Sequence, residues 1–234
     1  MVVSINQPAY LPWLGYLDRI ARSDLHVVLD DVQFEKNSYV NRNKVRTKDG
    51  WCWLTVPVQT KGKFGDLPIN QLEVADDTMW CHKHYETFRM NYARADYFDA
   101  HAPFLTECYR RPWRHLLELM NFQSAYLRQA FSIQTPIVYS SSLSAAGRKD
   151  ELVLNICRAV GATHYLSGPL GTAYIREEIF RDASVTVSYH RYSHPTYQQA
   201  FPGFEQQMTA FDLLLNHGPA SKAIMAGSST SPLN

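Results

Sequence analysis

The first thirty residues alternate between short apolar runs and a helical pattern, and this alternation restricts the fold more than any other feature. Residues 2–6 form a β-branched run typical of a buried strand, and Pro8 and Pro12 then exclude its continuation. Apolar residues recur at helical spacing over 13–22, and a second apolar run covers 25–30. A strand–loop–helix–strand unit of about thirty residues is typical of a βαβ motif. We therefore expect an α/β fold with a Rossmann-like, mostly parallel sheet flanked by helices.

The same alternation returns after residue 135. The pattern predicts strands over 135–140, 163–168 and 185–190, and helices over 149–161, 173–182 and 208–216. Gly161 stands where a left-handed helix C-cap is needed, and Thr172 is the expected N-cap of the helix that follows. Residues 51–58 alternate strictly and predict a further strand, with Trp51 and Trp53 on one face.

The middle of the chain has a different character. Helical patterns cover 79–92, 102–120 and 122–132, with no clear linker on either side. We expect residues 1–78 and 135–226 to form two parts of one α/β domain, and 79–134 to be a helical insertion or subdomain. Residues 227–234, rich in small polar side chains, are expected to be a frayed tail.

Composition excludes several classes of function. The formal net charge is +1 and the basic residues are scattered, which argues against nucleic acid as a partner. No apolar run approaches the roughly 18 residues that a membrane span needs. The N-terminus has no basic segment followed by an apolar core, so we expect no signal peptide. Four cysteines without paired spacing indicate free thiols and a cytoplasmic protein.

Polar residues follow every expected parallel strand, and they define the candidate site. They are Gln7 after the first strand, Asp30 and Asp31 after the second, Ser140, then Ser167 and Gly168, and finally His190 with His194 further on. Ligands of open parallel sheets bind outside the carboxyl ends of the strands. We therefore expect Gln7, Asp30, Ser167 and His194 to reach one small molecule. The alternative is that these residues only cap helices and form turns.

Two further stretches have candidate roles. His194 is the expected general acid–base group, because histidine alone titrates near neutrality when unperturbed, and Asp30 and Asp31 are its expected catalytic partners. Asn41, Arg42 and Asn43 would bind a carboxylate or phosphate, with Arg42 as the bidentate donor. The alternatives are a solvated turn or an ion pair of Arg42 with the two acids. The backbone of residues 167–171 has glycines that suit either an anion site or a tight turn.

Other reactive side chains have structural interpretations. His84 shares a helical face with aromatic residues and is expected to be a hydrogen-bonded core histidine. Cys81 and His84 are too few ligands for a metal, so no metal site is expected. Cys52 and Cys157 are expected to be packing thiols.

The chain resembles the WbqC-like family. The resemblance rests on stretches that follow one another along nearly the whole length: INQPAYLPWLGYLDRI, DDVQFEKNSYVNRNKV, GWCWLTVPV, GKFG, NYARADYF, CRAVGATHYLSGPLG, YSHPTY and DLLLNHGP. It implies a bacterial cytoplasmic protein of surface-polysaccharide, glycolipid or natural-product biosynthesis, but no established catalytic set. The family pattern includes most of the strand-end positions named above, and Tyr10 and Trp13 of its first stretch complete the expected substrate-binding set.

The opening unit also looks like that of nucleotidylyltransferase folds, but residues 11–14 lack the two histidines that hold a triphosphate there. The leading hypothesis is an enzyme that transfers an acyl or aminoacyl group to an amine of a small polar metabolite, such as a nucleotide-linked amino sugar. The donor would be a thioester of coenzyme A or of an acyl-carrier protein. One alternative is an ATP-dependent enzyme that activates a carboxylate to form an amide. Another is a non-catalytic scaffold whose aromatic stretches at 9–16 and 51–53 form a recognition face.

Overall fold

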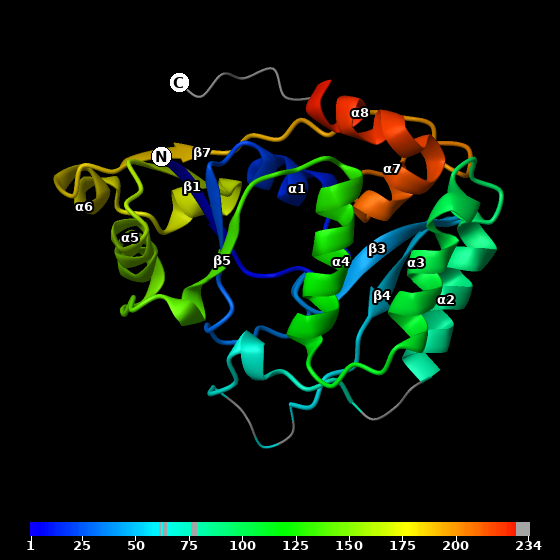
Figure 1. The fold of residues 1–234 in the computed structure, drawn as a ribbon, viewed down its shortest axis with the longest axis horizontal. Coiled ribbons are helices and arrows are strands. Elements are labelled where there is room, and N and C mark those ends of the chain that lie inside the picture. Colours follow the sequence, from blue (N-terminus) through cyan, green and yellow to red (C-terminus); the bar gives the residue numbers. More distant parts are fainter. Residues whose placement is uncertain (61, 63–64, 76–78, 228–234) are drawn as a thin grey trace.

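A five-stranded parallel sheet forms one half of the molecule. The computed structural model describes residues 1–60, 62, 65–75 and 79–227. The strands are β1 (Val2–Asn6), β2 (Leu25–Val28), β5 (Ile137–Tyr139), β6 (His164–Ser167) and β7 (Thr186–Tyr189), and their order is β5-β2-β1-β6-β7 (Figure 1). All neighbours are parallel. The expected Rossmann-like α/β sheet is thus confirmed.

Alternate strand residues face opposite sides of this sheet. Val3, Ile5 and Val27 pack with α5 (Lys149–Ala159) and α6 (Glu177–Asp182) in one hydrophobic cluster. On the other side, the Ser4 hydroxyl and the His26 Nδ1 lie 2.8 Å apart, beneath Tyr16 of α1 (Leu14–Ala21). Helix α1 is buried on every side from Leu14 to Ile20, because it lies between the sheet and a second core.

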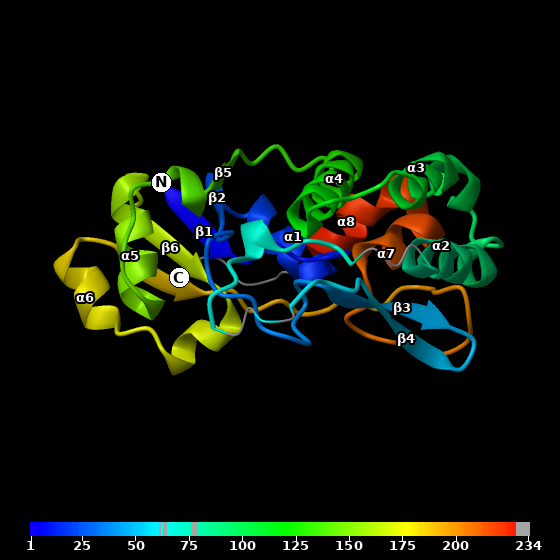
Figure 2. The ribbon, with the colours of Figure 1, turned by 90° about the horizontal axis from the view of Figure 1, so that it is seen from below.

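The second core fills the other half of the molecule. It contains the antiparallel pair β3 (Arg42–Thr47) and β4 (Gly50–Thr55), and helices α2 (Met79–Tyr92), α3 (Phe98–Arg110), α4 (Leu116–Ala130), α7 (Ala210–His217) and α8 (Ser221–Gly227). Short 3₁₀ segments cover Ile69–Gln71, Ser140–Ser142, Pro169–Ala173 and Gly218–Ala220. Phe104 stacks on Tyr126 and Phe211, and so joins α3, α4 and α7. Figure 2 shows the two halves side by side, with α1 between them.

The prediction of one helix over 102–120 has the wrong bounds. Helix α3 ends at Arg110, and α4 begins only at Leu116. Pro112 explains the break, because a proline ring disfavours helical backbone in the residue before it, and Arg111 is extended with ψ of 133°. The helix expected over 122–132 is the second part of α4.

The loop after β6 also differs from expectation. Thr172 does not cap a helix, because residues Pro169–Ala173 form a 3₁₀ turn in which its hydroxyl donates to the Pro169 carbonyl. Helix α6 begins at Glu177, after Arg176. The Asp150 carboxylate fixes this start by accepting from the Arg176 backbone N–H and guanidinium, and the same contacts lower the pKa of Asp150 to about 2.

Residues 42–44 belong to strand β3, and only Asn41 lies in the turn before it. Asn43 and Val45 point into the core, while Arg42 and Lys44 face outward opposite β4. The expected alternation of β4 is confirmed: Trp51 is exposed and Leu54 is buried. Gly161 has φ of 70°, which confirms the left-handed cap after α5. The expected frayed tail falls largely outside the described residues. In the parts of the chain that are described, we find no helix that has both the length and the apolar character of a membrane span.

Candidate functional site

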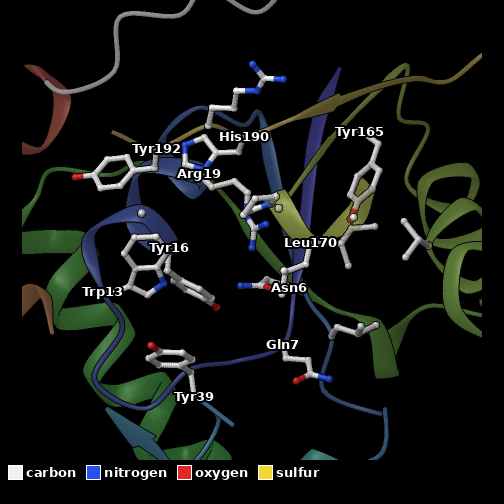
Figure 3. Close-up of a pocket in the computed structure, with 18 of the residues that line it drawn as sticks. Asn6, Gln7, Trp13, Tyr16, Arg19, Tyr39, Tyr165, Leu170, His190 and Tyr192 are labelled. Atoms are coloured by element: carbon white, nitrogen blue, oxygen red, sulfur yellow. The ribbon is translucent and has the colours of Figure 1, made fainter. Parts of the chain in front are cut away.

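A cavity of about 990 Å³ lies outside the carboxyl ends of β1, β6 and β7 (Figure 3). From β1 the chain builds the sheet through β2 and β5 on one side, and then through β6 and β7 on the other. The crevice between β1 and β6 is therefore the point where the strand order reverses, which is the usual ligand site of such sheets. Helix α1 and the turn Pro169–Ala173 provide further walls.

A buried carboxylate–imidazole pair borders the cavity. The Nε2 of His190, at the end of β7, lies 2.7 Å from Oδ2 of Asp18 on α1. His190 is 8 % exposed and Asp18 is 3 % exposed, so the pair is shielded from water. A carboxylate only accepts hydrogen bonds, so Nε2 carries the proton and Nδ1 is left as the basic nitrogen. Asp18 also accepts from the Nε of Arg22 at 2.7 Å, which balances its charge.

The neighbouring residue on α1 supplies a buried cation. Arg19 is 7 % exposed, and its Nε is buried without a hydrogen-bond partner. None of the described residues forms an ion pair with its guanidinium, which points into the cavity toward Asn6 in Figure 3. Burial lowers the pKa of Arg19, and the charged form is costly there without an anion. A carboxylate or phosphate beside Arg19 would compensate this buried charge.

Two glycines make room for side chains of the cavity wall. A Cβ on Gly168 would fall on Nη1 of Arg19, so a larger residue at 168 would displace the guanidinium. A Cβ on Gly15 would meet the indole of Trp13, which lies back over the first turn of α1. Both glycines are needed for close approach and not for backbone conformation.

Aromatic rings line the side of the cavity next to α1. Trp13, Tyr16, Tyr39 and Tyr192 all belong to the lining, and Trp13 contacts Tyr192 edge to face at 5.7 Å. In Figure 3 His190 and Arg19 lie at one end of the cavity, and Gln7 and Tyr39 lie at the other. The arrangement suits a ligand with an anionic group at the first end and an apolar or planar part along the aromatic wall.

Some of the residues selected from the sequence meet at this cavity. Gln7, Trp13, Gly168 and His190 belong to its lining, and they come from segments far apart in the chain. The polar strand ends that converge are therefore those of β1, β6 and β7.

The acids after β2 lie in a separate cluster. The Asp30 carboxylate accepts from the Ser141 N–H at 3.0 Å and from the Ser141 hydroxyl at 2.7 Å. Ser140 donates its hydroxyl to Asp31, and its Oγ accepts from the Asp30 N–H. These contacts join β2 to the turn after β5, beside the cavity but outside its lining. The four-residue convergence expected from the sequence is wrong in including Asp30.

Four other candidates make structural contacts. Tyr10 is fully buried, and its hydroxyl lies 2.7 Å from Nδ1 of His84 and 2.8 Å from the Tyr109 hydroxyl. This contact also confirms His84 as a core histidine. Asn41 donates to the Val56 carbonyl, and Asn43 donates to that of Leu11. The fourth, Arg42, lies on the outer face of β3.

The side chains of Ser167 and His194 also make contacts outside the cavity. The Ser167 hydroxyl donates to the carbonyl of Gly168 beneath the turn and is not in the lining. His194 is half-buried, contacts the Pro195 carbonyl through Nδ1 and packs against Phe204. Burial lowers the pKa of His194. Neither residue reaches the cavity with its side chain, so the convergence is also wrong in including them.

The sequence did not single out Asp18, Arg19, Tyr16 or Tyr39 as site residues. The only local signal for the first two is a pair of opposite charges in a helix that follows the first strand and so packs at the strand ends. Nothing local links Asp18 to His190, which is 172 residues away. No cysteine belongs to the cavity lining, and within the described ranges no three His, Cys, Asp or Glu side chains are grouped to hold a metal.

The fold and this cavity define a Rossmann-like α/β protein with its candidate site at the switch point of the sheet. The chain belongs to the WbqC-like protein family, whose model matches residues 7–224. It is also similar to the uncharacterized protein Rv1507c of Mycobacterium tuberculosis (strain ATCC 25618 / H37Rv), with 35 % identity over 222 residues, 92 % of this chain and 94 % of that protein. No solved structure matches the chain.

Proposed function

We propose that this chain is an enzyme that transfers an acyl or aminoacyl group to an amine of a small anionic metabolite. The observation that carries the proposal is that one cavity is lined both by His190, which is held by Asp18, and by Arg19, which has no ion-pair partner among the described residues. An amine must lose a proton as it attacks a carbonyl, and a histidine held by a carboxylate is suited to accept it. Arg19 would bind the carboxylate or phosphate of the same metabolite.

The reaction would proceed as direct attack on a thioester. The amine nitrogen forms a bond to the acyl carbon while Nδ1 of His190 takes a proton from it. The side-chain amide of Asn6, which lies in the lining toward the Arg19 guanidinium, supplies an N–H donor for the oxyanion. The carbon–sulfur bond then breaks, and the thiolate leaves with the proton that His190 had accepted. A direct transfer fits a lining without a cysteine nucleophile.

In this proposal His190 takes the acid–base role that the sequence suggested for His194. His194 remains a candidate of the loop, but its Nδ1 is engaged with the Pro195 carbonyl. The two histidines are four residues apart, so replacing each of them in turn gives a matched pair of variants.

The test is release of free thiol from acetyl coenzyme A in the presence of amino acids or amino sugars. We expect acceptor-dependent release to fall roughly 10²–10⁴-fold in His190→Gln, and less than about threefold in His194→Gln. Arg19→Gln should raise the KM of the acceptor much more than it lowers kcat. Equal activity of His190→Gln and the wild type would refute the role of His190. Product formation that requires ATP and releases no thiol would favour the ATP-dependent alternative.

A further inference from the structure

The outer face of β3 and β4 carries an aromatic and cationic strip that we define as Tyr39, Arg42, Lys44, Trp51 and Trp53. The Arg42 guanidinium lies 4.3 Å from the Trp53 ring centroid, and the Lys44 Nζ lies 4.4 Å from that of Trp51. The two indoles contact each other edge to face at 5.7 Å. Trp51 is 41 % exposed and Tyr39 is 39 % exposed, which is unusual for rings of this size.

Among the described residues, the two cations of the strip have no carboxylate partner. None of the ion pairs in the described parts of the chain includes Arg42 or Lys44. Arg42 donates a hydrogen bond from Nη1 to the side-chain Oδ1 of Asn37 at 3.3 Å. Arg46, on the same face of β3, differs because it is buried and its guanidinium donates to the carbonyls of Thr47, Gly50 and Pro202. The charges of Arg42 and Lys44 are thus held by the indoles and left without a counter-ion.

The strip is continuous with the cavity. Tyr39 belongs to the cavity lining and also contacts Trp53 at 5.8 Å. In Figure 3 Tyr39 lies at the end of the cavity opposite His190 and Arg19. Figure 2 places β3 and β4 at the outer edge of the molecule, away from the parallel sheet. A ligand whose reacting end lies near His190 would therefore leave the cavity past Tyr39 and cross the strip.

We propose that the strip binds the nucleoside diphosphate end of the ligand whose reacting end occupies the cavity. Arg42 and Lys44 are alternate residues of one strand face, so their Cα atoms lie about 7 Å apart and adjacent phosphates can each meet one of the two side chains. The base would stack on the exposed indole of Trp51, as bases do on aromatic surfaces. The proposal rests on the proposed function only in assigning the reacting end to the cavity.

Charge and size favour this occupant over larger ones. A single-stranded nucleic acid needs a basic track along several phosphates, whereas the strip offers two unpaired cations in a chain of net charge +1. An acidic protein surface would need a much wider contact area than five side chains provide.

The experiment measures binding of ADP, UDP and inorganic pyrophosphate by calorimetry at low salt, with the full chain. The double variant Arg42→Gln/Lys44→Gln should raise the Kd of all three ligands at least about tenfold. Trp51→Ala should raise the Kd of ADP and UDP about tenfold and leave that of pyrophosphate within about twofold. The matched control, Arg110→Gln/Lys222→Gln, removes one arginine and one lysine that are exposed elsewhere and should change no Kd. Circular dichroism and thermal unfolding check that each variant folds.

Four outcomes would overturn the proposal. The first is no binding of ADP or UDP at low millimolar concentration, and the second is an unchanged Kd in the Arg42/Lys44 double variant. The third is ADP binding that depends on Arg19 alone, which would move the diphosphate into the cavity. An oligonucleotide that binds far more tightly than ADP would also reject a nucleoside diphosphate as the occupant. None of these results depends on whether His190 is needed for thiol release. The proposed binding by the strip and the proposed reaction can therefore be refuted independently.

Discussion

Asp18 and Arg19 are adjacent residues of opposite charge with different environments. Asp18 contacts Arg22 and His190, whereas Arg19 has no carboxylate partner in the described structure. An ion pair between neighbours would have cancelled both charges within α1. Because Asp18 pairs elsewhere, the Arg19 charge remains available to a ligand, and the His190 ring is held in one orientation.

The Asp18–His190 contact predicts the effect of replacing Asp18. In Asp18→Asn the carboxamide no longer requires Nε2 to carry the proton, so the basic nitrogen is no longer held toward the substrate. We expect kcat for thiol release to fall roughly 10²–10⁴-fold, with KM nearly unchanged. The measurement is the pH profile of kcat/KM for Asp18→Asn and the wild type. The same substitution should not abolish ligand binding, because Arg19 is intact.

Arg22→Gln is the control for that prediction, since it removes the other partner of Asp18 and leaves His190 in place. A purely structural role of Asp18 would make both variants equally slow and equally unstable in urea. Positioning of His190 predicts that only Asp18→Asn is slow.

At the scale of elements, the turn after β6 is fitted closely around the site. Gly168 leaves space for the Arg19 guanidinium, and a Cβ on Gly171 would fall on the Ser167 hydroxyl. The backbone N–H of His190 donates to the Ser167 carbonyl, which holds the end of β7 against β6. Small displacements of this turn would therefore change the positions of both the Arg19 guanidinium and His190.

Gly168→Ala should separate ligand binding from stability. Gly168 has φ of −71°, which alanine adopts readily, so the added methyl group displaces only the far end of the Arg19 side chain. We expect the free energy of unfolding to change by less than about 1 kcal/mol. Protection of the fold by inorganic phosphate, measured as a rise in Tm, should be lost.

Gly227→Ala is a suitable control because a Cβ there would meet nothing within 4 Å. Unchanged phosphate protection in Gly168→Ala would show that Arg19 is not the anion-binding group.

Most elements were predictable because their signals are local. The parallel strands, α2 and the Gly161 cap follow from periodicity and from the special backbone of glycine. Strand β3 was missed because Asn43 in the strand and Asn41 just before it look like turn residues until the core supplies carbonyl partners for their amides. The first turn of α6 was misplaced because Asp150, distant in sequence, fixes Arg176.

At the scale of the whole molecule, two buried histidines lie in the interior, one on the α1 side of the parallel sheet and one in the second core. His26 lies under α1, and His84 lies in the aromatic cluster with Trp80 and Tyr109. Burial is the main cause that lowers the pKa of each to about 3, and Arg19 and Lys83 add to the shift of His26 and His84 respectively. Both residues therefore stay neutral in the folded state well below the pH at which they protonate in the unfolded chain.

These two histidines predict acid sensitivity above the range where carboxylates titrate. The folded pKa values lie below the unfolded value near 6.5, so their contribution to stability is full above that pH and is lost as the pH falls. Each should lower the free energy of unfolding by about 1.4 kcal/mol per pH unit below pH 6. Urea unfolding between pH 7 and pH 5 measures this slope.

In His84→Gln the slope should decrease by the contribution of one proton, and His82→Gln, on the exposed side of the same helix, should keep the wild-type slope. Identical slopes in all three proteins would contradict a neutral His84 in the folded state.

By itself the sequence determined the α/β class, the parallel strands and the edge of the sheet where polar residues gather, because strand and helix periodicity and turn residues act over a few neighbours. Tertiary structure decided which of those residues share a site. Asp18 meets His190, and Gly168 meets Arg19, only because α1 folds back over the ends of β1, β6 and β7. Contacts between residues so far apart in the chain depend on packing, and packing leaves no local pattern in the sequence.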